Sequence, residues 1–141
     1  RQEHLQTNLI IRALRLLDHY FNLTGHHTYK ISTVNCTNAG LMNIPASRFF
    51  RPYSFALRWF EGMRLRRIKN AMTHAAQNGE VFHLWWHPHN FGVNRKENFA
   101  NLLELLNHFK DLQTEYGMES KNMQELATPL RESADATTLV N

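Results

Sequence analysis

Apolar residues recur at helical spacing in three stretches of the chain, and this periodicity predicts three amphipathic helices. The expected helices cover residues 2–22, 54–77 and 94–116. A glycine follows each stretch, and glycine readily adopts the left-handed conformation that ends a helix. The apolar stripes are, in order, Leu5, Leu9, Ala13, Leu16, Leu17 and Tyr20; Leu57, Phe60, Leu65, Ile68, Met72 and Ala75; and Phe99, Leu102, Leu103, Leu106, Phe109 and Tyr116.

Shorter segments separate these helices. Residues 81–86 alternate in character and predict a strand, and the loop 87–93 leads from it to Asn94, an expected N-cap with Glu97 as its capping-box partner. Ser54 is expected to cap the preceding helix. A possible strand at 28–34, a turn-rich loop at 35–40 and an extended piece around Pro45 lie earlier in the chain.

The order of helices and strands predicts an α/β fold. Two or three short strands make a poor sheet alone, so we expect the C-terminal portion of a larger, irregular (β/α) barrel whose early strands are missing from this chain. The chain has 141 residues and begins with Arg1, which favours a fragment or a processed product. Residues 1–127 are expected to form the domain portion, and the polar residues 128–141 a mobile tail. Apolar surface should remain uncovered where earlier strands would pack.

Charge and cysteine content exclude few classes of protein. The formal net charge is +4, and a solvated helix face is the simplest interpretation of its local concentration. No apolar run approaches the roughly 20 residues of a membrane span. The single cysteine, Cys36, leaves the compartment open, with the cytoplasm slightly favoured. The clustered basic residues are Arg48, Arg51, Arg58, Arg64, Arg66, Arg67 and Lys69.

The predicted strand 81–86 has two different faces because side chains alternate along a strand. Phe82, Leu84 and Trp86 share an apolar face that should pack beneath helices. Trp85 and His87 share the opposite face, which combines rings with a titratable nitrogen, as a sugar-binding cleft would. His87 also falls at the C-terminal end of the strand, where α/β folds carry their chemistry.

Three histidines follow the spacing His83-x-x-x-His87-x-His89. No carboxylate or thiolate accompanies them in a ligand-like arrangement, so we expect no metal site in this chain alone. His83 and His89 are expected to satisfy local backbone groups. A proton-transfer role suits His87 better, since histidine side chains change charge near neutral pH.

The segment Phe82-His83-Leu84-Trp85-Trp86-His87-Pro88-His89-Asn90-Phe91-Gly92 resembles the last catalytic motif of polysaccharide deacetylases with the NodB-homology fold. Supporting similarity extends over residues 40–126. Ile44-Pro45-Ala46-Ser47 resembles a proline-containing strand of that family, and residues 94–126 resemble its closing helix and final short strand.

The resemblance implies an incomplete (β/α) barrel that removes N-acetyl groups from an amino-sugar polysaccharide or oligosaccharide. In that family one Asp and two His hold a divalent metal, commonly zinc, a second Asp acts as base, and a His of the last motif protonates the leaving amine. By its place in the motif that histidine is His87, and we expect Trp85, His89 and Asn90 to contact the sugar.

The early motifs of the family, with their Asp pair and His pair, are absent from this sequence. Its only aspartates are Asp18, Asp111 and Asp135, and none is placed to act beside His87. The metal half is therefore expected elsewhere in the full-length protein, and this chain alone should be inactive. Two alternatives stay open: a non-catalytic domain whose basic helix 55–78 binds an anionic polymer or a protein, and a hydrolase of non-sugar C–N bonds. No nucleic-acid partner is expected, and the sequence leaves the oligomeric state undetermined.

Overall fold

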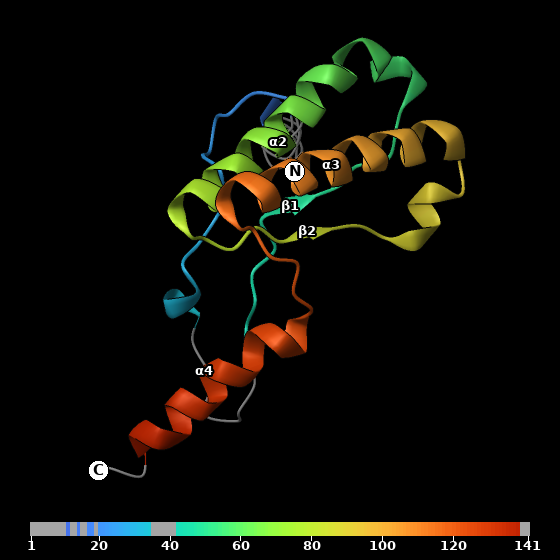
Figure 1. Cartoon of the computed structure of the whole chain (residues 1–141). Coiled ribbons are helices and arrows are strands. Elements are labelled where there is room, and N and C mark those ends of the chain that lie inside the picture. Colours follow the sequence, from blue (N-terminus) through green and yellow to red (C-terminus); the bar gives the residue numbers. More distant parts are fainter. Residues whose placement is uncertain (1–10, 12–13, 15–16, 19, 35–41, 139–141) are drawn as a thin grey trace.

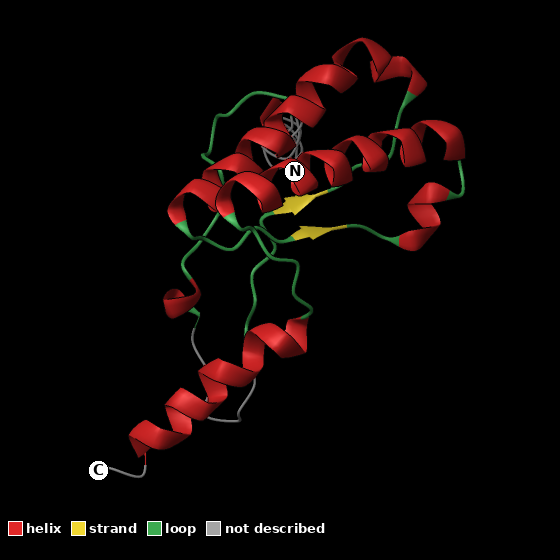
Figure 2. Ribbon diagram, viewed as in Figure 1, coloured by secondary structure: helices red, strands yellow, loops and turns green. Residues whose placement is uncertain are grey.

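Two long helices lie side by side across a pair of short strands (Figure 1). The computed structural model describes residues 11, 14, 17, 18, 20–34 and 42–138, and side chains up to residue 130. Figure 2 shows the strand pair beneath the helices and a further helix that projects away from them. The elements are η1 (Ile31–Thr33), β1 (Arg48–Phe49), η2 (Phe55–Phe60), α2 (Glu61–Asn78), β2 (Leu84–Trp85), η3 (Pro88–Phe91), α3 (Arg95–Tyr116) and α4 (Met123–Thr138), where η marks a 3-10 helix.

The two strands are parallel, and helix α2 connects them in a β-α-β unit. Arg48 lies opposite Leu84, and Phe49 lies opposite Trp85. Parallel strands leave the sheet at the same edge, so the segments that follow β1 and β2 begin beside each other. This edge holds the candidate site residues around His87. The β-α-β unit agrees with the α/β pattern of the sequence.

The core lies between α2, α3 and one face of the strand pair. The predicted stripe of α2 is confirmed for Leu65, Ile68, Met72 and Ala75, which are all buried. Phe82 and Leu84, predicted to face the helices, pack against this core. The buried members of the core cluster are Phe50, Leu65, Ile68, Met72, Phe91, Leu105 and Leu112.

Helix α3 buries a different stripe from the predicted one. Asn98, Leu105 and Leu112 are its buried residues, at intervals of seven. Phe99 and Leu103, which belong to the predicted stripe, are 56% and 58% exposed. Apolar residues occur on more than one side of α3, and α2 covers only one of these sides. Part of the apolar surface of α3 is thus exposed among the described residues.

Two of the three helix ends predicted from glycine are confirmed. Gly79 and Gly117 adopt left-handed φ angles of 62° and 68° and cap α2 and α3. The capping box at the start of α3 is wrong. Asn94 itself takes a left-handed φ of 52° and makes no side-chain cap; its side-chain amide instead donates to the carbonyl oxygen of Tyr53 at 3.4 Å. Ser54 likewise precedes η2 without a side-chain cap.

The two ends of the chain differ more from expectation. Tyr29 forms only an isolated bridge to Val81, and η1 occupies residues 31–33, so the predicted strand 28–34 is wrong. The predicted helix 2–22 lies largely outside the described residues, although residues 11, 14, 17 and 18 are helical, and the loop 35–40 lies wholly outside. Helix α4 occupies residues 123–138, where the resemblance implied a short strand and the sequence a polar tail. None of the described helices is long and apolar enough to cross a membrane.

Candidate active site

His87 lies two residues beyond the end of β2, where the chain turns into η3. Its backbone is still extended, with φ −92° and ψ 131°, and Pro88 opens η3 immediately afterwards. Proline suits the first position of a helical turn because its fixed φ is helical and the missing N–H would have no partner there. The backbone is therefore still extended at His87, beyond the end of the strand, and the chain turns at Pro88.

Aromatic rings surround the His87 imidazole on the open face of the strand pair. The ring of Trp85 lies 5.0 Å away at 87°, and that of Phe49 lies 6.0 Å away at 60°. Phe49 and Trp85 pack across the strands with ring centroids 4.6 Å apart. The imidazole of His89 stacks on that of His87 at 5.1 Å and 17°. Both imidazoles are exposed, so protons and ligands can reach them.

The predicted site residues thus come together in part. Trp85, His87 and His89 form one ring cluster, and Phe49 is a member that the sequence analysis missed. The register of β1 against β2 places Phe49 beside Trp85. Only this pairing could have revealed it, and two-residue strands carry too little periodicity to predict register.

Asn90, the fourth predicted residue, serves mainly to shape the turn. Its backbone N–H donates to the carbonyl oxygen of His87 at 2.9 Å. Its own carbonyl oxygen accepts from the side-chain amide of Asn98 at 3.4 Å. Asn90 is half-buried, and its backbone holds η3 against the start of α3.

Asn98 joins the segments that follow the two strands, and the sequence analysis missed it. Its side chain is fully buried at 0% exposure. The side-chain oxygen accepts from the backbone N–H of Tyr53 at 2.7 Å, and the side-chain nitrogen donates to the carbonyl oxygen of Val93 at 2.7 Å. A buried amide with both functions satisfied rigidifies its surroundings. Its sequence signal is a polar residue seven positions before Leu105 and fourteen before Leu112, on the buried stripe.

Trp86 differs in degree from the prediction. It faces the helices, since its ring meets the buried rings of Phe50 at 6.2 Å and Phe91 at 6.0 Å. Its exposure is nevertheless 37%, the same as that of Trp85. The expectation that Trp86 is buried is therefore wrong.

His83 satisfies a backbone group, as expected. Its Nδ1 lies 3.1 Å from the carbonyl oxygen of Pro45. The His83 backbone N–H donates to the hydroxyl of Ser47, and the carbonyl oxygen of His83 accepts from the N–H of Ser47 and Arg48. His83 therefore ties the strands together below the site. The His89 side chain differs, because it stacks on the ring of His87.

The basic residues do not form the solvated face expected from their sequence. Arg48, Arg64 and Arg67 are 8%, 2% and 4% exposed. Arg64 donates to both carboxylate oxygens of Glu61 and, at 2.6 Å, to the carbonyl oxygen of Arg51. Three of the seven cations are thus structural, and this result weakens the alternative in which the whole basic helix binds a polymer.

Arg48 and Arg67 converge on one carboxylate. Asp18 lies 3.2 Å from Arg48 and 3.7 Å from Arg67. Burial of the Asp18 carboxylate would raise its pKa, but hydrogen bonds from Thr24 and Arg48 outweigh this effect and lower the pKa to about 2. Burial and the Arg48 charge lower the pKa of Arg67, and the Asp18 carboxylate opposes this shift without reversing it.

A second pair of histidines lies near the opposite end of β2. The rings of His26 and His74 stack at 4.6 Å, and Thr28 bonds to both His74 and Glu80. Burial and the neighbouring charges of His74, Arg67 and Arg48 lower the pKa of His26. This pair is part of the packing between the N-terminal segment and α2, remote from His87 along the strand.

The described residues do not fit the metal site that the resemblance implies. Among them no group of three His, Cys, Asp or Glu side chains is arranged to hold a metal ion. Comparison with known proteins identifies no relative: no family model, curated protein or solved structure matches the chain. The functional assignment must therefore rest on the geometry of the His87 edge and on the motif that contains it.

Proposed function

We propose that this chain is the C-terminal part of a metal-dependent deacetylase of N-acetylated amino-sugar polymers, and that His87 is its general acid. In this proposal the full-length polypeptide forms an incomplete (β/α) barrel, and its metal-binding motifs lie in another part of that polypeptide. The observation that carries the proposal is the position of His87. Its exposed imidazole lies two residues beyond β2, near the C-terminal end of a parallel strand pair, and is surrounded by rings.

The geometry of this edge suits proton donation to a departing amine. An exposed imidazolium on an aromatic-lined surface can reach a bound amide from one side. It would transfer its proton to the nitrogen as the C–N bond breaks, so that an amine leaves rather than an amide anion. His89 stacks on the His87 ring and adds a second ring to this surface. Trp85 and Phe49 offer apolar surface for the non-polar face of a sugar ring.

Release of acetate from an N-acetylglucosamine oligomer by the full-length protein tests this proposal. We expect His87→Ala to lower kcat about 10²–10⁴-fold, the usual contribution of a general acid. KM should change little, because the proton moves only as the bond breaks. Metal content should equal that of the wild type, since His87 is no ligand.

His89→Ala is the matched control, because it removes a neighbouring imidazole from the same turn. Its loss of kcat should be clearly smaller than that of His87→Ala. Unchanged turnover in His87→Ala, or loss of metal from it, would assign the residue a different role. A wild-type protein that releases no acetate would refute the proposed reaction itself.

A further inference from the structure

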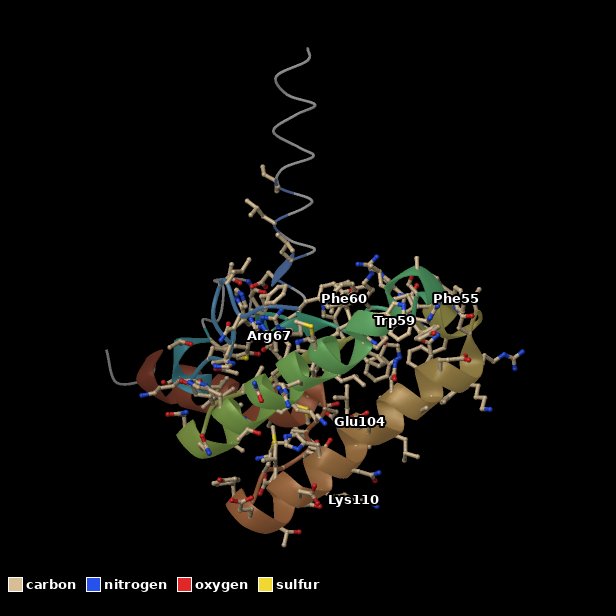
Figure 3. All side chains as sticks on the ribbon, turned by 90° about the horizontal axis from the view of Figure 1, so that it is seen from above. Phe55, Trp59, Phe60, Arg67, Glu104 and Lys110 are labelled. Atoms are coloured by element: carbon tan, nitrogen blue, oxygen red, sulfur yellow. The ribbon has the colours of Figure 1, made fainter. Side chains whose placement is uncertain are left out.

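Beyond β1 the chain exposes an unusual group of apolar side chains. Phe55 is 69% exposed, Trp59 79%, Phe60 45% and Met63 38%. They belong to η2 and the first turn of α2, and Figure 3 shows Phe55, Trp59 and Phe60 along one rim of the molecule. A single exposed apolar residue needs no explanation, whereas a contiguous group of aromatic rings marks a binding surface.

Arg58 turns this apolar group into a surface for an anion. Its guanidinium lies 4.2 Å from the ring centroid of Phe55 and 5.1 Å from that of Trp59. Stacking of this kind holds a guanidinium at the surface, and within the described residues only one of the Arg58 donors is used, in a 3.5 Å bond to the carbonyl oxygen of Phe55. Arg66, one turn beyond Met63, is also exposed.

No acidic partner neutralises these two cations within the described residues. Glu61 is the only acidic residue between positions 48 and 79, and Arg64 and Asn101 already occupy it. The ion pairs of the described residues leave Arg58 and Arg66 out. The surface Phe55–Arg58–Trp59–Met63–Arg66, called the aromatic–arginine face below, therefore combines rings with unpaired positive charge.

The aromatic–arginine face follows β1, just as His87 follows β2. The strands are parallel, so both segments leave the same edge of the sheet. The buried side chain of Asn98 ties them together, because it bonds to Tyr53, two residues before Phe55, and to Asn90, three residues after His87. In Figure 1, η2 and η3 lie at the same end of the α2–α3 pair.

We propose that the aromatic–arginine face is a subsite for acidic sugar units, so that the substrate is an N-acetylated polysaccharide that also carries carboxylate groups. The inference rests on the proposed function and specifies its substrate class. The rings stack on the apolar faces of sugar units, and a guanidinium binds a carboxylate with paired hydrogen bonds. An anionic lipid surface offers similar chemistry, but the shared sheet edge with His87 favours the polysaccharide.

The test is binding, measured on full-length protein that carries His87→Ala so that ligand is not consumed. The probes are an oligosaccharide of alternating glucuronate and N-acetylglucosamine, and the same oligosaccharide with its carboxylates reduced to alcohols. We expect the acidic form to bind at least about tenfold more tightly, since charge-assisted hydrogen bonds are the stronger ones. Arg58→Gln should abolish most of this difference, and Trp59→Ala should weaken both forms.

Lys110→Gln is the matched charge control, because Lys110 is exposed on α3 away from this rim (Figure 3). It should leave both affinities unchanged. Equal binding of the acidic and reduced forms, an equal effect of Lys110→Gln and Arg58→Gln, or Arg58-dependent binding only to phosphatidylglycerol vesicles would overturn the inference. Acetate release by the wild-type protein tests the proposed reaction separately. If the acidic oligosaccharide binds but the wild type releases no acetate, the proposed reaction is contradicted and the proposed subsite is not.

Discussion

The arginines of residues 48–67 fall into two groups that the sequence does not distinguish. Arg64 and Arg67 lie beneath the surface of α2, where carbonyl and carboxylate oxygens hold them. Arg58 and Arg66 stand exposed without an acidic partner among the described residues. The buried group stabilises the fold, and the exposed group is free to bind. Position relative to the core, rather than charge density along the chain, decides which role a cation takes.

The aromatic residues divide in the same way. Phe50 is 1% exposed and belongs to the core, yet Phe55 and Trp59, only five and nine residues later, are largely exposed. The chain leaves the covered face of the strand pair between these positions and enters η2. Burial of a phenylalanine side chain is worth roughly 1.5–3 kcal/mol, and this part of the chain forgoes that stabilisation.

The buried group should give the largest effect on stability. Arg64→Ala removes hydrogen bonds to Glu61 and to the carbonyl oxygen of Arg51, and it leaves a largely buried carboxylate without its charge partner. Breaking a buried pair from one side costs about 3–5 kcal/mol. We therefore expect a loss of about this size in the free energy of unfolding, measured by urea denaturation.

Two variants sharpen this result. Adding Glu61→Gln to Arg64→Ala should recover part of the loss, because the unpaired charge is gone. Lys69→Ala breaks an exposed pair with Glu104, whose side chains are 30% and 49% exposed, and should cost less than about 1 kcal/mol. Equal losses for Arg64→Ala and Lys69→Ala would remove the distinction between buried and exposed cations.

Asp18 should make stability depend on acid pH. Its pKa is lowered from 3.8 to about 2 in the folded protein, so its stabilising effect is complete above pH 3.8 and is lost as the pH falls toward 2. The shift corresponds to about 2 kcal/mol. Urea denaturation at several pH values should show Asp18→Asn less stable than wild type at pH 7 by this amount, with the two converging near pH 2. A constant difference across this range would contradict the shift.

The sequence predicts where α2 and α3 end better than it predicts which of their side chains are buried. Glycine chemistry identifies the ends of α2 and α3 because Gly79 and Gly117 act locally. The buried stripe of α3 could not be identified, since which apolar side of a helix is covered depends on its neighbour. The same reason explains Asn94, where a tertiary contact to Tyr53 replaces the predicted capping box.

The candidate site was predictable where it depends on alternation within one strand. Trp85 and His87 share the open face, as the sequence indicates. Phe49 and Asn98 could not be assigned, because they reach the site through the strand register and a buried bridge between distant segments. Contacts of this kind leave no periodic pattern in the chain.

The most direct test of the central claim is the pH dependence of kcat for full-length wild type and His87→Ala on an N-acetylglucosamine oligomer. If His87 donates the proton, wild-type kcat should fall at alkaline pH as the imidazolium is lost. His87→Ala should have a much lower kcat and should lack this alkaline fall, since no imidazolium is required. An alkaline fall of the same shape and position in His87→Ala would contradict the role of His87 as the general acid.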